Sequence, residues 1–203
     1  KEYRDRGEER TREMERVTRL LREHSNLDPF KRESEELSHI SNKVRGKWNV
    51  ALSLRQTHHL RNSLFIIDSD AVASDLYRMA KREEFDFVEI LTSETVSLIQ
   101  QTLQDKEHST SSRGIILIST IDSLRGLDLP GLDSLFILSP RAIESNVDYI
   151  HVSGRLGRAG RPGTCINLVT NSELFSLRPL IKRLGIHFNR IALEPHLKAL
   201  RER

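Results

Sequence analysis

Cysteine is almost absent from this sequence, which holds one such residue, Cys165, among 203. A single thiol cannot form a disulfide within the chain, so a disulfide-braced secreted scaffold is disfavoured and a reducing compartment is favoured. The same scarcity argues against the common zinc sites, which use several cysteines. The eight histidines show no ligand spacing either, so we predict no metal site.

Long apolar runs are missing as well. No stretch approaches the roughly 18 apolar residues of a membrane helix. The chain opens on charged residues rather than on a signal-peptide pattern. The apolar fraction is 37% and the charged fraction 30%. We therefore predict a soluble intracellular chain without membrane contact, large enough for one core plus an appendage.

A strong excess of one charge is also absent, because the formal net charge is +3. The distribution is uneven: residues 1–36 hold 10 Lys+Arg against 11 Asp+Glu, which leaves 22 against 18 for residues 37–203. The densest positive cluster spans Arg155–Arg161. A mildly basic folded part fits a surface that faces phosphates, although a solvated loop would show the same bias.

Residues 1–37 differ in composition from the rest of the chain. Residues 1–25 carry many charges of both signs, with a narrow apolar stripe formed by Met14, Val17, Leu20 and Leu21. We predict a charged helix there, followed by a linker over 26–37 that is broken at Asp28-Pro29. The helix is either a solvated tether, the commoner use of such patterns, or a docking arm for a protein partner.

Short apolar runs alternate with helical patterns over residues 38–194. The predicted central strands are Ser63–Ser69, Phe87–Leu91, Gly114–Thr120, Ser134–Pro140 and Gly163–Thr170. Five helices are predicted around these strands, the first of them before the first strand: 47–54, 70–82, 93–105, 147–158 and 171–184. This alternation predicts an α/β fold, an open parallel sheet with helices on both faces.

Several boundaries follow from local signals. We expect Ser93 to cap the third of these helices, and Asn171 or Ser172 to cap the fifth, which Gly185 closes. Two further strands are expected at 38–44 and 187–193, and a terminal helix at 195–203. The chain is thus divided into an extension (1–37), an α/β domain (38–194) and a terminal helix (195–203).

The most informative stretch is His151–Gly163, which reads HVSGRLGRAGRPG. Arg155, Arg158 and Arg161 lie within seven residues with no acid among them, and glycines recur between them at three-residue spacing. Glycines allow close approach to the backbone, and guanidinium groups match phosphate oxygens. If residues 149–158 form a helix, Arg155 and Arg158 share one face. The pattern therefore predicts a polyphosphate site.

Two stretches resemble motifs of one family. YIHVSGRLGRAGRPG (149–163) resembles motif VI of the DEAD-box ATP-dependent RNA helicases, usually YIHRIGRTGRAGRxG, and STIDSLRGLDLP (119–130) resembles their motif V, ATDVAARGLDIP. The resemblance covers about residues 38–193 and implies the second, C-terminal RecA-like domain. The phosphate loop GxxxxGK[ST] and the DEAD tetrapeptide of the first domain are not found. That domain is either absent or belongs to a longer protein of which this chain is a part.

The resemblance implies a role for each matched residue. Arg155 and Arg158 would act as arginine fingers on the γ-phosphate of ATP, whose Mg²⁺ is bound mostly by the first domain. Gly126 and Asp128 would approach the nucleotide, and Asp128 would accept a hydrogen bond from a ribose hydroxyl. Thr120 would contact an RNA phosphate. The two remaining matched residues would couple the domains: His151 and Arg125.

Three positions depart from the family pattern. Val152 replaces an arginine that bridges to the first domain, and Ile121 replaces an acid, with Asp122 following one place late. Residues 89–112 contain no arginine, although the corresponding helix of the family carries one that contacts RNA in the QxxR element. If RNA is bound, we expect contacts through sugar and phosphate with little base specificity.

Two functions remain open at this point. The first is the C-terminal domain of a divergent DEAD-box-like helicase that remodels RNA or ribonucleoprotein. The second is a non-catalytic helicase-like module that serves as a structural or assembly component of a large ribonucleoprotein, such as a ribosome precursor. A DNA-directed member of another superfamily-two branch fits the motif spacing less well. The sequence does not distinguish mitochondrion, nucleus and cytoplasm.

Overall fold

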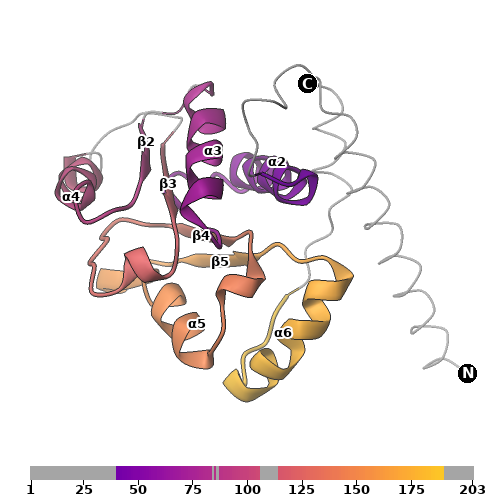
Figure 1. The fold of residues 1–203 in the computed structure, drawn as a ribbon. Helices are drawn as coiled ribbons and strands as arrows, with labels where there is room; N and C mark the ends of the chain where they lie inside the picture. The colour runs from indigo at the N-terminus through magenta and orange to yellow at the C-terminus, as the bar shows by residue number, and fades with distance from the viewer. Residues whose placement is uncertain (1–39, 84, 86, 106–113, 190–203) are drawn as a thin grey trace, which may run out of the picture.

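The computed structural model describes residues 40–83, 85, 87–105 and 114–189, which are built around one five-stranded sheet (Figure 1). The strands are β1 (Ser63–Ile66), β2 (Phe87–Ile90), β3 (Ile115–Ser119), β4 (Ser134–Ile137) and β5 (Thr164–Asn167). They lie in the order β2-β3-β1-β4-β5, and every neighbouring pair is parallel. The predicted open parallel sheet is therefore confirmed.

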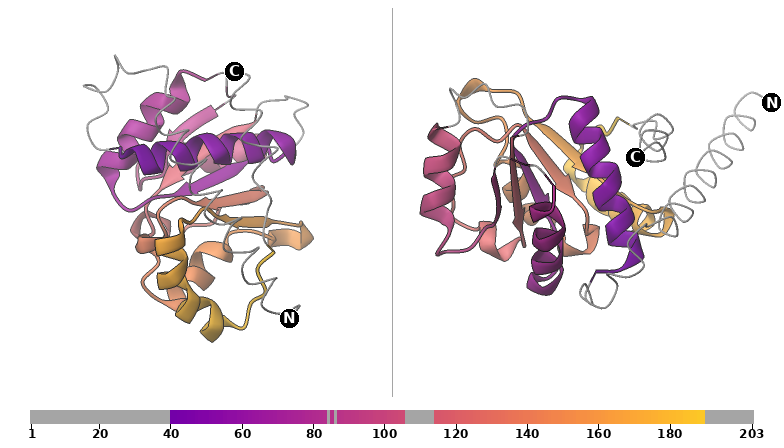
Figure 2. Two further views of the ribbon diagram at one scale, coloured as in Figure 1. Left: turned by 90° about the vertical axis from the view of Figure 1, so that its right-hand side faces the viewer. Right: turned by 90° about the horizontal axis from the view of Figure 1, so that it is seen from above.

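Helices cover both faces of this sheet. The α-helices are α2 (Asn42–Thr57), α3 (Asp70–Lys81), α4 (Val96–Asp105), α5 (Asn146–Ser153) and α6 (Asn171–Leu184). Three short 3-10 helices accompany them: η2 (Asp122–Leu124), η3 (Pro140–Ala142) and η4 (Arg158–Gly160). In Figure 1, α2 and α3 lie on one side of the twisted sheet and α4, α5 and α6 on the other, and Figure 2 shows the same layers from two further directions.

The core is divided by the sheet into two clusters. Because neighbouring residues of a strand point to opposite faces, Phe65 packs toward α2 and α3, whereas Leu64 and Ile66 pack toward α4, α5 and α6. On the first side, the Trp48 ring lies 4.6 Å from Phe65, and Phe65 stacks on Phe136 at 4.9 Å. All four residues of both β1 and β4 are buried. This explains why these strands are short, continuously apolar runs in the sequence.

Helix α2 begins earlier than the sequence suggested. We predicted a strand over 38–44, but residues 42–44 already belong to α2, whose first turn is capped by the Ser41 hydroxyl as it accepts from the Val44 N–H at 3.3 Å. The described part of that predicted strand is therefore wrong. A serine N-cap in extended conformation outweighs the weak strand pattern, since it satisfies a backbone donor that would otherwise be left unpaired.

A buried ion pair joins α2 to α6. The Lys47 ammonium donates to the Leu138 carbonyl at 2.6 Å and contacts the Glu173 carboxylate at 2.8 Å, while Lys43 reaches the same carboxylate at 2.7 Å. Burial lowers the pKa of Lys47, although Glu173 opposes that shift. Desolvation alone would raise the pKa of Glu173, but hydrogen bonds from Lys43, Lys47 and Thr170 outweigh it and lower the pKa to about 2.

Two predicted helix caps are wrong. Helix α4 starts at Val96 rather than after Ser93, because Thr92 and Thr95 exchange hydrogen bonds between side chain and backbone at 2.9 and 3.2 Å. Helix α6 is capped by Thr170, not by Asn171 or Ser172, and the Glu173 carboxylate accepts from the Thr170 N–H at 2.8 Å. The predicted closing residue Gly185 is confirmed, with φ of 63° in the left-handed region that favours glycine.

Helix α5 is shorter than predicted. It begins at Asn146, where Ser145 and Asp148 form a capping box, and it ends at Ser153 instead of Arg158. After Gly154 the backbone hydrogen bonds change from the i→i−4 spacing of an α-helix to i→i−3: the Arg155 N–H donates to the Val152 carbonyl and the Leu156 N–H to the Ser153 carbonyl. Gly157 then takes φ of 68°, which ends the helical course before η4. Arg155 and Arg158 are therefore not neighbours on one helix face.

Some predictions fall wholly or partly outside the described residues. The helix at 1–25, the linker at 26–37 and the terminal helix at 195–203 lie there. Of the strand predicted over 187–193, the described residues 187–189 are not a strand. Within the part of the chain that the structure describes, no helix has both the length and the apolar character needed to cross a membrane.

Candidate functional site

The residues that the sequence singled out lie mainly on two segments that follow neighbouring strands. Residues 120–133 connect β3 to β4, and residues 138–163 connect β4 to β5 through η3, α5 and η4. Thr120 directly follows β3 and so lies at the carboxyl end of that strand, whereas Leu127 and Asp128 come shortly before β4, and Arg155 and Arg158 lie between α5 and β5. Hydrogen bonds between the two segments bring Leu127 and Asp128 against Arg155 and Arg158.

Arg158 and Asp128 form an ion pair between the two segments. The Arg158 guanidinium donates through Nη1 to Asp128 Oδ1, and its Nε donates to the Gly154 carbonyl at 3.1 Å. The two side chains are 38% and 66% exposed. Exposed pairs of this kind contribute little net stability, about 0–1 kcal/mol. Both groups can therefore exchange partners with a ligand at small energetic cost.

Arg155 contacts a backbone carbonyl of the other segment rather than a carboxylate. Its Nη1 donates to the Leu127 carbonyl, and its Nε is buried without a hydrogen-bond partner among the described residues. Burial lowers the pKa of Arg155, the neighbouring Arg158 lowers it further, and Asp128 raises it. Arg155 thus has a buried N–H donor that is not used and a second guanidinium beside it. This local positive charge favours the binding of an anion.

Two glycines shape the backbone beside these arginines. Gly126 has φ of 75°, and no atom within 4 Å would meet a Cβ built there. Gly157, between the two arginines in sequence, has φ of 68°. An L-residue with a side chain would be strained at either position. Glycine at 126 therefore lets the backbone turn into Leu127 and Asp128 and leaves open space at the surface.

Arg125 and His151 lie beside a small hollow next to α5. The hollow is also lined by Ile121, Leu124 and Val152. Arg125 contacts Asp122 at 3.5 Å and Asp148 at 3.8 Å, so it links η2 to the first turn of α5. The His151 side chain is exposed. Sequence reasoning assigned both residues to domain coupling, and the structure places them on one surface.

The positions that depart from the family pattern have clear locations. Val152 is 1% exposed and belongs to the core cluster under α5, so position 152 contributes packing in this chain. Ile121 is 8% exposed, whereas the Asp122 side chain is 89% exposed. The Thr120 hydroxyl lies 3.1 Å from the Ser123 hydroxyl. Thr120 therefore carries a hydroxyl at the carboxyl edge, two residues before an exposed acid.

Sequence reasoning missed one contact at this site. The Gln100 amide of α4 donates through Nε2 to the Asp128 carbonyl at 2.7 Å. The two residues are 28 positions apart, and nothing in the pattern VSLIQQTLQD distinguishes Gln100 from Gln101 or Gln104. Only the packing of α4 against the sheet shows which glutamine faces the segment.

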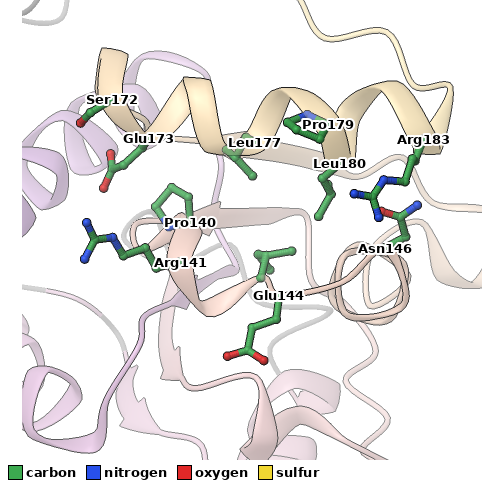
Figure 3. A pocket seen from close by; sticks show the side chains of 11 residues that line it. Pro140, Arg141, Glu144, Asn146, Ser172, Glu173, Leu177, Pro179, Leu180 and Arg183 are labelled. Atoms are coloured by element: carbon green, nitrogen blue, oxygen red, sulfur yellow. The ribbon is translucent and has the colours of Figure 1, made fainter.

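A cavity of about 280 Å³ lies apart from these residues (Figure 3). It lies between η3, the start of α5 and α6, where Leu177 and Leu180 point toward Pro140. Arg141 and Arg183 also line it. None of the site residues predicted from the sequence lines this cavity. The chemistry at the motif residues is therefore that of an open surface edge.

Known proteins show what this arrangement is similar to. Nucleolar RNA helicase 2 of Mus musculus is 44% identical over 80 residues, which is 38% of this chain and 9% of that protein. ATP-dependent RNA helicase eIF4A of Encephalitozoon cuniculi is 33% identical over 121 residues, 60% of this chain and 28% of that protein. This chain is homologous to the DEAD-box RNA helicases. No protein-family model matches it.

Solved structures agree with the DEAD-box relationship at the level of fold. The C-terminal domain of the DEAD-box protein Dbp5 superposes with a TM-score of 0.58 at 24% identity, over 78% of this chain and 91% of that one. E. coli DEAD-box protein SrmB gives a TM-score of 0.52 at 23% identity, over 73% and 85%. The described part of this chain thus has the fold of a DEAD-box C-terminal domain. It spans 9% and 28% of the two DEAD-box relatives named above.

Proposed function

We propose that this chain is the C-terminal RecA-like domain of a DEAD-box ATP-dependent RNA helicase that remodels RNA or ribonucleoprotein. The observation that carries the proposal is the meeting of Arg155 and Arg158, which lie between α5 and β5, with Leu127 and Asp128, which lie between β3 and β4. Two cations and one hydrogen-bond acceptor lie there, on segments whose sequences resemble motifs V and VI.

The chemistry follows from what phosphoryl transfer requires. Such enzymes mainly position the reacting groups and neutralise the charge that develops on the transferred phosphoryl group. The Arg158 side chain is 38% exposed and donates to Asp128 and to the Gly154 carbonyl. Because the pair with Asp128 is accessible to water, Arg158 can exchange that partner for the γ-phosphate of ATP. Asp128, released by that exchange, accepts a hydrogen bond from a ribose hydroxyl. Arg155 stays anchored on Leu127 and adds a second positive charge.

A first RecA-like domain completes this reaction. It supplies the phosphate loop and the acids that hold Mg²⁺, since the described part of this chain has no group of three or more His, Cys, Asp or Glu able to hold a metal ion. Arg125 and His151, exposed beside the hollow near α5, then contact that domain when it closes. Val152 is committed to the core, so the domain contact relies on these two residues.

The proposed RNA contact is sequence-independent. Thr120 follows β3 at the carboxyl edge and meets a phosphate, a type of contact that carries no base information. The comparison structures support this assignment: Dbp5 of S. cerevisiae is described as bound to RNA and ADP BeF3, and domain 2 of Mss116p as bound to an RNA duplex. The nucleolar helicases among the relatives favour a nucleolar RNA, such as a ribosome precursor, as substrate.

The non-catalytic module is the second candidate, and the departures Val152 and Ile121 are the observations in its favour. The helicase relatives do not favour it. In that case Arg155 and Arg158 would contact RNA or protein rather than nucleotide, and the protein would sediment with a large ribonucleoprotein without hydrolysing ATP.

The deciding experiment measures RNA-stimulated ATP hydrolysis by the protein that carries this chain together with its first domain. Arg158→Ala is expected to lower the rate by about 10³-fold or more, in line with the 10³–10⁵ of other arginine fingers. Arg178→Ala, a change of an exposed arginine on α6, is the control and should stay within about twofold.

Two results would contradict the proposal. The first is a failure of the unchanged protein to hydrolyse ATP in the presence of RNA. The second is an Arg158→Ala variant that hydrolyses ATP as fast as the Arg178→Ala control.

A further inference from the structure

A side chain of α4 holds the backbone of the proposed ribose-binding residue. Gln100 Nε2 donates to the carbonyl oxygen of Asp128 at 2.7 Å. The adjacent carbonyl, that of Leu127, accepts from Arg155. Two consecutive carbonyls of this segment are thus fixed from two different elements, one by α4 and one by the turn that follows α5.

The next residue supplies a third fixed point. Leu129 is fully buried in the cluster that also contains Ile99 and Leu103 of α4. With its backbone fixed on both sides, Asp128 has little freedom beyond its own side-chain torsions. Its carboxylate then has a defined position, near Arg158 in this structure.

We propose that Gln100 is a positioning residue that places the Asp128 carboxylate for a ribose hydroxyl of the bound nucleotide, an inference that rests on the proposed function. Gln100 itself does not touch the nucleotide. It acts through one hydrogen bond to the backbone of the residue that does.

The packing of α4 explains why this hydrogen bond can fix the position of Asp128. Ile99 and Leu103 are 0% and 1% exposed, so the buried face of α4 is fixed against the sheet. Gln100 extends from that fixed helix, and its amide makes a hydrogen bond to the motif V segment. A displacement of α4, the helix that contacts RNA in the family this chain resembles, would therefore move Asp128 as well.

The test uses two glutamine variants and two nucleotide probes. Gln100→Met keeps the length and helix propensity of the side chain but removes the donor. Gln101→Met makes the same change at the exposed neighbouring residue. ADP and 2′,3′-dideoxy-ADP differ only in the ribose hydroxyls, so the ratio of their dissociation constants reports the ribose contact. Both constants are measured on the full protein by titration, together with the thermal midpoint of each variant.

The expected result is specific to ADP. One hydrogen bond contributes about 0.5–1.5 kcal/mol, equivalent to about a two- to tenfold change in Kd. Gln100→Met should therefore weaken ADP binding by about two- to tenfold and leave dideoxy-ADP binding unchanged. Gln101→Met should match the unchanged protein with both probes. In hydrolysis assays, KM for ATP should rise in Gln100→Met while kcat stays within about twofold.

Three results would contradict the inference about Gln100, and they differ in what they imply for the proposed function. If the unchanged protein prefers ADP over dideoxy-ADP and Gln100→Met keeps that preference in full, the inference about Gln100 is overturned while the proposed function stands. If Gln100→Met weakens both probes equally and lowers the thermal midpoint, the contact serves folding only. If the unchanged protein does not bind ADP, the proposed nucleotide function and this inference both fall.

Discussion

Two ion pairs link segments of this domain that are far apart in sequence, and they differ in burial. In the pair between α2 and α6, the side chains of Lys47 and Glu173 are 4% and 9% exposed. In the pair between the motif segments, Arg158 and Asp128 are 38% and 66% exposed. Both Glu173 oxygens contact Lys47, and one of them also contacts Lys43, whereas only one Asp128 oxygen is paired with Arg158.

The difference separates a structural pair from one that can bind a ligand. Breaking a buried pair leaves an uncompensated charge away from water, so a buried pair is committed to the fold. An exposed pair can lose its partner to water or to a ligand at a cost of about 0–1 kcal/mol. On these grounds the Lys47–Glu173 pair stabilises the domain, and the Arg158–Asp128 pair is the one available to nucleotide.

The largest expected change in stability comes from breaking the buried pair. Glu173→Gln should lower the free energy of unfolding by about 3–5 kcal/mol, because the Lys47 charge is then left without its anionic partner. Urea unfolding at neutral pH measures the effect. Glu144→Gln, at an exposed position on the segment between η3 and α5, is the matched control and should change little. Equal stability of the two variants would show that the buried pair contributes nothing.

Acid should weaken the same pair in a defined pH window. The pKa of Glu173 is lowered to about 2 in the folded chain from 4.5. A group with a depressed folded pKa stabilises the fold above its unfolded pKa, and that stability is lost as the pH falls from about 4.5 to about 2. A shift of this size corresponds to about 3 kcal/mol.

Unfolding measured between pH 5 and pH 2 tests this window. The unchanged protein should lose stability more steeply than Glu173→Gln, whose amide does not titrate. Parallel curves for the two proteins would contradict the assignment of this acid sensitivity to Glu173.

The smallest expected change in stability comes from the exposed pair. Asp128→Asn should alter the free energy of unfolding by less than about 1 kcal/mol, since the pair is accessible to water. The same variant should nevertheless bind ADP more weakly, because an amide is a poorer acceptor than a carboxylate for a ribose hydroxyl. Urea unfolding and ADP titration on one preparation separate the two effects. A large loss of stability would mean that this pair, too, belongs to the fold.

The strands could be predicted from sequence because burial on both faces leaves a local signature. The run Ser63–Ser69 contains β1 and the run Ser134–Pro140 contains β4, and the whole of each strand is buried. The parallel arrangement followed from the alternation with helical patterns. Some errors lie at element ends: α5 stops at Ser153 and α4 starts at Val96, because local hydrogen bonds and a left-handed glycine override the apolar periodicity. Others lie at the two borders of the domain, where the described residues of the strands predicted at 38–44 and 187–193 are not strands.

Two of the wrong predictions could have been avoided from the sequence: the cap of α6 and the end of α5. Thr170 and Glu173 are spaced as in a capping box, T-x-x-E, and this spacing marks the start of α6. The Thr92–Thr95 exchange before α4 had no comparable sequence signature. The helix predicted through Arg158 contains Gly154 and Gly157. Glycine destabilises a helix interior, so these two residues already indicated an earlier end.

The sequence by itself determined the parallel α/β class, the order of the elements and the identity of the arginines and acid at the candidate site. Those features depend on residues close together in the chain, where periodicity and motif spacing act. Only the tertiary structure decided that Arg158 meets Asp128, that Gln100 rather than Gln101 holds the Asp128 backbone, and that Val152 belongs to the core. These contacts depend on how segments far apart in sequence pack on a common sheet. Contacts between residues so far apart in the chain produce no periodic pattern in the sequence from which they could be predicted.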